Sequence, residues 1–424
     1  MNAVYSDDSS SSDENDSDVQ NFIQETNLDQ SMEDDSTLPP TNSTFDLTLP
    51  ATHSYLGNNL EDVRGRTILD DGIYMNLPLL VKQSVVLFPG QTLPMTVRAT
   101  QTIDMLQKCI EKNRTFGVVC LGNEGMLPIG TTAEIFQYKH DEQSPGFRVK
   151  AKGRQRFKIL HVIQGYDKIS ANVKILPEIS LRPPLFDERL LSLDRLRITP
   201  SNKQEAMRQQ NIERHDAILS HWPSWVYRQY DSKRLSIRIR HHLQYIEMQG
   251  SNIPEDPTEL SFWVAQNLLL DDKERIVLLT YDCAIPRLRW ELEYLVKDRL
   301  LTCSSCDDFI GKQSDVFPMN KEGPQSAYCN PAGIIHETVT LYKAQGLILN
   351  DEVPQTEYSW FPGYAWTIAL CKGCHGHMGW KFTAVHSDLR PQAFWGLTRK
   401  SLRSKEVCKC RLASEFSDSD DETS

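Results

Sequence analysis

Two Cys-x-x-Cys pairs constrain this chain more than any other feature of its sequence. They supply four sulfur atoms, at Cys303, Cys306, Cys371 and Cys374. Two such pairs match a structural zinc site, in which four thiolates surround the ion and no position stays open for water. The alternative is four unrelated reduced thiols. We expect one structural zinc ion per chain, since such sites contribute on the order of 10–16 kcal/mol in zinc-finger peptides.

The second pair lies inside a run of aromatic residues. The stretch from Tyr358 to Phe382 contains Trp360, Trp366 and Trp380. Aromatic residues packed this densely can simply form a core. However, the segment WFPGY that begins at Trp360 breaks the alternation of a strand and contains Pro and Gly. This pattern favours rings on a shaped loop, which can face a pocket as well as a core.

These residues carry a resemblance. The run WFPGYAW, the following CKGC, and the later GWKF and FWGLTR resemble the cereblon family. The segments YCNP at Tyr328, HET at His336 and FPGQTLPM at Phe88 are similar as well, and the resemblance covers roughly Phe45 to Cys408. It implies an α+β multidomain fold. A mostly antiparallel β domain like the N-terminal domain of Lon, with a helical insertion and bundle, precedes an all-β, zinc-stapled domain of two antiparallel sheets.

In that family the aromatic region is the thalidomide-binding domain, so the resemblance implies a pocket with tryptophan walls and Phe382 at its base. The family's ligand meets the backbone carbonyl of the residue at position 358, where the best-known members have a His and this chain has Tyr358. Ala332 replaces another His at the edge of the pocket. We expect these changes to alter affinity but not the class of ligand. The expected ligand-binding residues are Asn330, Pro331, Tyr358, Ser359, Trp360, Trp366, Trp380 and Phe382.

A box with apolar walls and no charged side chain suits a small, flat, neutral ring. Cyclic imides of the glutarimide kind fit this description and the resemblance, including those at the C-terminus of damaged proteins. The imide N–H needs an acceptor, and the backbone carbonyl of Tyr358 can accept it. One imide oxygen needs a donor, and the backbone N–H of Trp360 can donate.

Composition and periodicity divide the rest of the chain. Residues 1–45 are rich in Ser and Asp without Lys or Arg, and with residues 411–424 they predict acidic, disordered tails. Residues 73–297 predict a Lon N-terminal-like domain, with strands at 77–81 and 85–87 and a helix at 103–110. Residues 257–299 predict further helices, one of them capped at Asp271-Asp272. The zinc-binding domain is expected at 298–408.

Residues 186–249 interrupt the Lon-like domain with a helical pattern. In the cereblon family the corresponding insertion binds the adaptor of a cullin-four ubiquitin ligase, the damage-specific DNA-binding protein. This chain has Trp222, Trp225, Tyr227 and Tyr230 at the matching place. The resemblance therefore favours adaptor docking, with exposed aromatic side chains as anchors. The alternative is a pair of helices that only covers the β domain.

No enzyme motif accompanies these features. The phosphate loop of an ATPase is missing, and the length leaves no room for a Lon protease domain. Together with these absences, the resemblance to the cereblon family implies a non-catalytic subunit of a cullin-four RING ubiquitin ligase, which recognises substrates for ubiquitylation and proteasomal degradation. The alternative is a zinc-stapled reductase of the methionine-sulfoxide type, with Cys329 as nucleophile. We expect His336 to be structural, and His375 and His377 to be loop residues rather than metal ligands.

Charge and hydropathy limit the partners and the compartment. The net charge of −11 comes from the two acidic tails, and only Lys372 lies inside its Cys-x-x-Cys pair, so we expect no nucleic-acid binding. No apolar stretch reaches the roughly 18–20 residues of a membrane helix. The N-terminus lacks a secretory signal. Ten cysteines with metal spacing, among them a weak pair at Cys408 and Cys410, fit a reducing compartment. We expect the cytoplasm and the nucleus.

Overall fold

The computed structural model describes most of the chain between residues 43 and 407. The predicted tails, up to residue 42 and from residue 411, lie outside the described residues, as does the pair Cys408 and Cys410. The boundary of the first tail at residue 45 is wrong, because Phe45 is buried in an aromatic cluster. The described ranges are 43–57, 59–122, 125–141, 146–165, 169–198, 202–218, 220–350 and 353–407.

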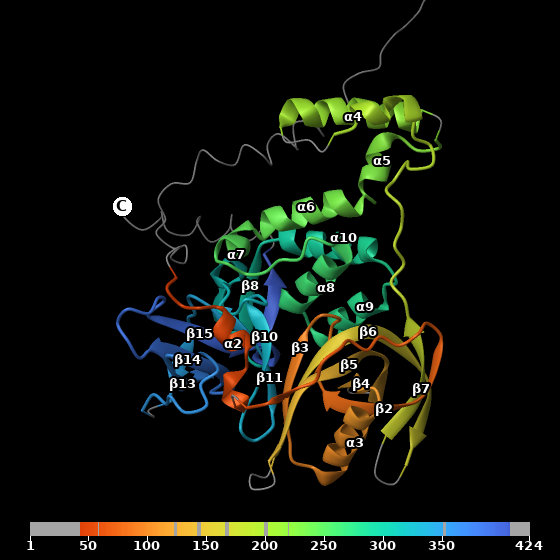
Figure 1. The fold of residues 1–424 in the computed structure, drawn as a ribbon. Coiled ribbons are helices and arrows are strands. Elements are labelled where there is room, and N and C mark those ends of the chain that lie inside the picture. The colour runs from red at the N-terminus through yellow and green to blue at the C-terminus, as the bar shows by residue number, and fades with distance from the viewer. Residues whose placement is uncertain are drawn as a thin grey trace, which may run out of the picture. The chain divides into compact units, whose positions relative to one another are not determined.

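A seven-stranded sheet forms the N-terminal β region (Figure 1). Its strand order is β1-β5-β4-β2-β7-β6-β3, and β5 also pairs with β6. Only the β2–β4 pair is parallel, so the prediction of a mostly antiparallel sheet is confirmed. Helix α3 (Thr100–Glu111) follows β3 and covers the predicted helix. The strands are β1 (Glu61–Asp62), β2 (Ile73–Gln83), β3 (Thr92–Val97), β4 (Thr115–Gly122), β5 (Gly125–Asp141), β6 (Gly146–Gln164) and β7 (Ile169–Leu176).

The predicted strand at residues 85–87 is wrong. These residues are buried, but β2 ends at Gln83 and Ser84 has a positive φ of 54°, so no ladder includes them. Side chains bind their carbonyl groups instead: Thr131 Oγ1 donates to the Leu87 carbonyl over 2.6 Å, and Arg275 Nη2 donates to the Val86 carbonyl over 2.7 Å. The apolar run reflects burial rather than strand pairing, because a buried backbone must find partners of some kind.

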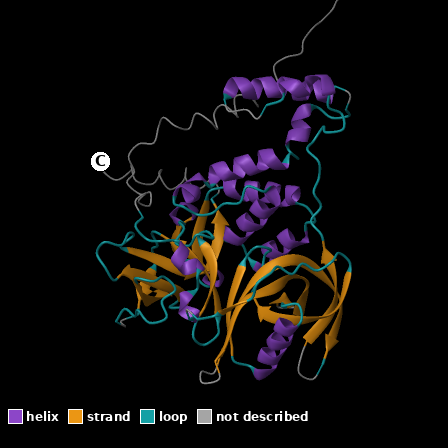
Figure 2. Ribbon diagram, viewed as in Figure 1, coloured by secondary structure: helices purple, strands orange, loops and turns teal. Residues whose placement is uncertain are grey.

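A helical region between residues 191 and 296 follows, and Figure 2 shows its helices grouped together next to the strands. Helix α6 packs along α10, and α8 is buried over most of its length. The predicted cap of α9 is confirmed, because Asp271 and Glu274 form a reciprocal capping box. No helix among the described residues is long and apolar enough to cross a membrane. The helices are η2 (Leu191–Leu196), α4 (Lys203–Ala217), α5 (Ser224–Arg228), α6 (Ser232–His242), α7 (Gln244–Met248), α8 (Pro257–Asn267), α9 (Asp272–Thr280) and α10 (Ala284–Val296).

The C-terminal β region contains two sheets, and every strand pair in them is antiparallel. One has the order β10-β11-β15-β14-β13-β12, and the other β16-β8-β9, which confirms the predicted pair of antiparallel sheets. Two short 3₁₀ helices, η3 (Gln313–Asp315) and η4 (Arg399–Ser401), lie between strands. The strands are β8 (Arg299–Cys303), β9 (Phe309–Lys312), β10 (Gln325–Cys329), β11 (Ile335–Leu341), β12 (Leu347–Leu349), β13 (Tyr364–Cys371), β14 (His377–Ala384), β15 (Ala393–Thr398) and β16 (Leu402–Glu406).

An N-terminal segment, residues 43–57, contacts both β regions. It contains α2 (Thr48–Ala51) and η1 (Ser54–Leu56). On the C-terminal β region, the Phe45 ring packs edge-on against Tyr364 at 5.3 Å. On the N-terminal β region, the Lys150 ammonium group donates a hydrogen bond to the Thr52 carbonyl. The sequence offered no sign of these contacts, because the residues involved lie far apart along the chain.

A buried cluster of charges joins the helical region to the C-terminal β region. Arg399 of η4 donates from Nε to Glu337 Oε2 over 2.8 Å and from Nη2 to Asp272 Oδ1 over 2.6 Å. Its Nη1 donates to the Leu270 carbonyl over 2.9 Å. Arg275 Nη2 lies 2.9 Å from the other carboxylate oxygen of Glu337, on β11. Glu337 is therefore shared between two guanidinium groups that come from different regions.

The environment keeps Arg275, Arg399 and Asp272 charged. Burial lowers the pKa of Arg275 to about 10, which still leaves it ionised at pH 7. Burial also disfavours the charge on Arg399, but Glu337 and Asp272 outweigh it and raise the pKa of Arg399. Burial disfavours ionised Asp272 as well, yet Arg399 holds the pKa of Asp272 below its ordinary value. The cost of desolvating such a cluster offsets much of the attraction within it, so the intact cluster adds little net stability. Removing one partner is strongly destabilising, because it leaves a buried charge unpaired.

We predict that Glu337→Gln destabilises the fold by about 3–5 kcal/mol, because it leaves two buried guanidinium groups with one carboxylate. Urea unfolding monitored by circular dichroism measures this change. Asp187→Asn is the matched control, since Asp187 pairs with Arg182 at the surface, where both side chains are 71% exposed. That control should cost less than about 1 kcal/mol. Equal losses in the two variants would contradict the special role of Glu337.

Candidate metal centre and aromatic site

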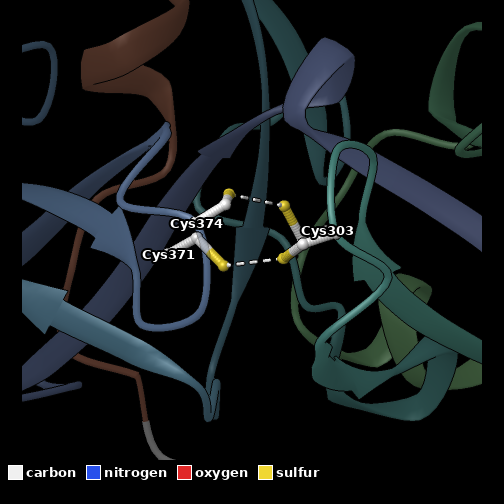
Figure 3. A group of neighbouring side chains, drawn as sticks. Cys303, Cys371 and Cys374 are labelled. Carbon is white, nitrogen blue, oxygen red and sulfur yellow. Dashed lines mark hydrogen bonds between the residues drawn. The ribbon is translucent and has the colours of Figure 1, made fainter.

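The four predicted cysteine ligands meet at one point. Cys303 ends β8, Cys371 ends β13, and their partners Cys306 and Cys374 lie in the turns that follow. All four sulfur atoms lie within 4.8 Å of one another. Two sulfur pairs, Cys303 with Cys374 and Cys306 with Cys371, are separated by 3.7 and 3.4 Å (Figure 3). Sulfurs placed about 2.3 Å from a tetrahedral zinc ion lie about 3.8 Å apart, so the group has the size that zinc requires.

The two turns have the same backbone geometry. In the first, the N–H of Asp307 donates to the Cys303 carbonyl over 3.0 Å, and in the second the N–H of His375 donates to the Cys371 carbonyl over 2.9 Å. Asp307 and His375 both have positive φ, at 63° and 56°. A Cβ atom at Gly373 in the second turn would lie 2.1 Å from the carboxylate of Asp308, so a larger residue there would displace that side chain. His375 thus contributes its backbone N–H to the turn, and the metal group contains neither His375 nor His377.

The pKa values of the thiols differ within the group. At Cys306 the backbone N–H of Asp308 favours the thiolate, but burial and the hydrogen bonds to the neighbouring thiols outweigh it and raise the pKa to about 12, and burial raises the pKa of Cys371. Burial raises the pKa of the Cys303 thiol, but the backbone N–H groups of Ser305 and Cys306 and the neighbouring thiols outweigh burial and lower it to about 7. The described cysteines are free, and the sulfurs of this group are too far apart for disulfides. The chemistry of the donor set therefore fits a structural zinc ion.

Beside this centre, aromatic rings from several elements form one cluster. Trp360 precedes β13, Trp366 lies on β13, and Trp380 and Phe382 lie on β14. Trp360 is buried and meets Trp380 edge-on, with ring centroids 4.6 Å apart. Trp366 and Trp380 are half-buried against the same cluster. The structure thus brings the three predicted tryptophans together. The rings of Trp360 and Trp380 are in contact, so a ligand between these two would have to part them.

Phe382 lies beneath these rings and is fully buried. Its ring stacks on Phe394 of the neighbouring strand at 5.1 Å and meets Phe361 edge-on at 4.8 Å. Gly396 makes this position possible, because a Cβ atom there would lie 2.7 Å from the Phe382 ring. Trp366 is paired directly with Phe382 across β13 and β14, so both side chains leave the sheet on the same face.

The loop before β13 is fixed at both ends. Gln355 and Trp366 exchange two backbone hydrogen bonds, of 2.9 and 2.8 Å, and the Trp366 indole N–H donates to the Glu357 carbonyl over 2.9 Å. Tyr358 has a positive φ of 55°, and its side chain is 54% exposed. Within the described part of the chain, neither the Tyr358 carbonyl nor the Trp360 N–H forms a hydrogen bond. One backbone acceptor and one backbone donor are therefore available beside the tryptophans.

An open cavity of about 400 Å³ lies against this loop. Tyr358 and Ser359 contribute to its lining from the loop, and Ser54 and Tyr55 contribute from the N-terminal segment. The remaining lining residues are Thr356, Glu357, Pro362, Gly363, Tyr364, Val385 and His386. Since no tryptophan lines it, this cavity is next to the predicted box rather than inside it.

Asn330 and Pro331 occupy the turn between β10 and β11. The Asn330 side-chain oxygen accepts the N–H of Ile334 over 2.8 Å, and the Pro331 carbonyl accepts a hydrogen bond from Arg98 of the N-terminal β region over 2.7 Å. The turn is therefore held from two sides. Its Asn330 amide nitrogen is the group still available for a ligand in the described structure.

His336 packs against two of the tryptophans. Its ring lies 5.0 Å from Trp380 and 5.8 Å from Trp360. Burial, together with the nearby His377 and Lys400, lowers its pKa to about 4, and among the described atoms its buried Nε2 has no hydrogen-bond partner. His377 also contacts Trp380, at 4.9 Å. Strand alternation did not reveal the contacts of His336, because they join parts of the chain that are distant in the sequence.

The helical region presents a second aromatic surface. Trp222 and Trp225 are 60% and 52% exposed, before and within α5, and Tyr230 is also exposed. Tyr227 is only half exposed. The expected aromatic side chains are thus available at the surface, where large apolar rings are unusual unless a partner covers them.

Two models of known families match the chain. The model described as "ATP-dependent protease La (LON) substrate-binding domain" matches residues 76–297. The model described as "Yippee zinc-binding/DNA-binding /Mis18, centromere assembly" matches residues 299–413. The second match agrees with the four-cysteine group, and zinc is the cofactor of the C-terminal β region.

Several curated proteins are similar over most of their length. Protein cereblon of Gallus gallus is 44% identical over 84% of this chain and 84% of its own length, and that of Danio rerio is 40% identical over 84% and 87%. A solved Lon N-terminal domain protein from Xanthomonas campestris matches 52% of this chain and 99% of its own, at 16% identity and a TM-score of 0.34. The identity to the curated proteins shows that this chain belongs to the cereblon family.

Proposed function

We propose that this chain is the substrate-recognition subunit of a cullin-four RING ubiquitin ligase. It binds cyclic imides at the aromatic site and presents the proteins that carry them for ubiquitylation and proteasomal degradation, in the cytoplasm and the nucleus. The observation that carries this proposal is the available pair formed by the Tyr358 carbonyl and the Trp360 N–H, placed beside three clustered tryptophans. Membership in the cereblon family supports it.

In this proposal the chain catalyses no reaction itself. The alternative, a reductase with Cys329 as nucleophile, is disfavoured by the state of that thiol. Cys329 is buried, burial raises the pKa of its thiol, and the thiol donates to the Asn330 carbonyl over 3.4 Å. A reactive cysteine needs an accessible thiolate, and this environment opposes both properties.

We assign Cys303, Cys306, Cys371 and Cys374 as the ligands of one zinc ion. The ion supplies structure only, because four sulfur ligands leave no position for water. These residues clamp the start of the C-terminal β region to the end of β13, and β13 also carries Trp366. The zinc centre thereby fixes one wall of the aromatic site.

We predict that Cys371→Ser abolishes stoichiometric zinc and unfolds the C-terminal β region, since structural zinc contributes on the order of 10–16 kcal/mol in model peptides. Elemental analysis by mass spectrometry and thermal denaturation provide the measurements. Cys283→Ser is the control, because Cys283 is a free thiol outside the metal group. Retention of one zinc ion by the Cys371 variant would refute the assignment.

The aromatic site suits a glutarimide ring. The imide N–H donates to the Tyr358 carbonyl and an imide oxygen accepts from the Trp360 N–H, while the tryptophan rings cover the faces. Burying ~100 Å² of ring at about 25 cal/mol per Å² yields only ~2.5 kcal/mol. Micromolar binding needs roughly 8 kcal/mol, so the two hydrogen bonds and a preformed site must supply most of the affinity.

We predict that thalidomide quenches tryptophan fluorescence and that its N-methyl imide analogue binds at least about 100-fold more weakly. Methylation removes the donor, leaves the Tyr358 carbonyl unpaired and adds a clash, together worth about 3 kcal/mol or more. Trp366→Ala should weaken binding of thalidomide, whereas Trp222→Ala, in the helical region, should not. Equal affinity for the two compounds would overturn the proposed ligand class.

The exposed aromatic surface around α5 supports an adaptor-binding role for residues 186–249. We propose that it binds the damage-specific DNA-binding protein, the adaptor of the cullin-four ligase. Large aromatic side chains dominate the energetics of protein interfaces when a partner buries them. Trp222, Trp225 and Tyr230 are the expected anchors.

We predict that the double variant Trp222→Ala, Trp225→Ala binds the adaptor at least about 30-fold more weakly, which corresponds to about 2 kcal/mol for one central anchor. Surface plasmon resonance with purified adaptor measures this loss. Tyr358→Ala is the matched control, because Tyr358 is comparably exposed but belongs to the imide site. If the control loses adaptor binding and the double variant keeps it, the interface lies elsewhere.

A further inference from the structure

The N-terminal segment places two side chains behind the aromatic site. His53 precedes η1 and Tyr55 lies within it, and the His53 Nδ1 atom lies 3.0 Å from the Tyr55 hydroxyl oxygen. That oxygen accepts the backbone N–H of Cys329, at the end of β10, over 3.1 Å. The Tyr55 hydroxyl hydrogen is then free to point at His53 Nδ1. His53 is almost completely buried, and burial, followed by the nearby Lys150, lowers its pKa to about 3, so it remains a neutral acceptor at pH 7.

Both side chains pack on Tyr328, which is the next ring toward the site. The ring centroids of His53 and Tyr55 lie 5.8 and 6.4 Å from that of Tyr328. Tyr328 is itself buried, and its hydroxyl oxygen accepts a hydrogen bond from Asn320 over 3.1 Å. The ring of Tyr328 is therefore fixed by contacts to its face and to its hydroxyl group.

Tyr328 stacks directly on Trp360. The two ring planes differ by only 9°, with centroids 5.0 Å apart. One face of Trp360 is thus covered by Tyr328, and the two ring planes share nearly the same tilt. Tyr55 also lines the cavity that borders Tyr358 and Ser359, so the same segment reaches the loop that supplies the imide acceptor.

We propose that His53, Tyr55 and Tyr328 are positioning residues for imide binding, which fix the orientation of Trp360 from behind. The inference rests on the proposed function, because it assumes that Trp360 forms part of the imide site. A stacked and hydrogen-bonded ring series holds Trp360 in one rotamer before the ligand arrives. The ligand then does not have to order this wall, and affinity increases because the cost of ordering falls.

The test is titration of the full-length protein with thalidomide, with the dissociation constant and the melting temperature measured for each variant. Tyr328→Leu removes the stack and should raise the dissociation constant about three- to tenfold, the range expected for one aromatic pair. Tyr328→Phe keeps the ring and should restore binding to within about twofold of the wild type. Tyr55→Phe removes only the hydroxyl that holds the segment to Cys329 and His53, and should weaken binding measurably.

Tyr342→Leu is the matched control. Tyr342 belongs to the same aromatic cluster and meets Phe317 edge-on at 5.9 Å, and no ring contact in the described structure joins it to Trp360. It should lower the melting temperature but leave the dissociation constant within about twofold, well below the effect of a lost aromatic pair. Wild-type affinity in Tyr328→Leu, or an equal loss in Tyr342→Leu, would overturn the positioning role alone. Absence of thalidomide binding by the wild-type protein would instead overturn the proposed function.

Discussion

The pairing of the Glu337 carboxylate with two arginines is the interaction that holds the helical region against the C-terminal β region. The carboxylate lies between Arg399 and Arg275, and so pairs a guanidinium group of the C-terminal β region with one from the helical region. A buried carboxylate between two buried cations tolerates little displacement, because moving it away would leave buried charges without a partner. Its neighbour on β11, His336, contacts two of the tryptophans. The strand that joins the two regions therefore also borders the aromatic site.

The aromatic site draws on several constraints at once. The zinc centre fixes the end of β13, the pairing of β13 with β14 places Trp366 opposite Phe382, and Gly396 leaves room for the Phe382 ring. In the proposed binding mode, neither the zinc centre nor Gly396 contacts the ligand. Together they leave a backbone acceptor and a donor available on a short loop, which is where polar recognition of a small neutral ring has to occur.

Some of this could be predicted from the sequence, and the reasons are physical. Spacing revealed the four cysteines, because metal geometry acts over a few residues, and Asp271 revealed the start of α9, because capping is equally local. Residues 85–87 misled the prediction, since an apolar run records burial and not the partner of the backbone. The contacts of His53 with Tyr328 left no local pattern, because they join side chains that are distant in the sequence. The tryptophans were predicted to be site residues from the family resemblance and not from periodicity.

The hydrogen bond of the Ser84 carbonyl has a consequence for the order in which the protein folds during synthesis. This carbonyl accepts a hydrogen bond from Arg399, 315 positions later in the chain, and Arg399 also binds the carbonyl of Leu270. During synthesis from the N-terminus, both carbonyls and Asp272 emerge long before the guanidinium group that pairs with them. The helical region therefore emerges from the ribosome with part of its buried polar surface unpaired, and these hydrogen bonds form only after Arg399 has been synthesised.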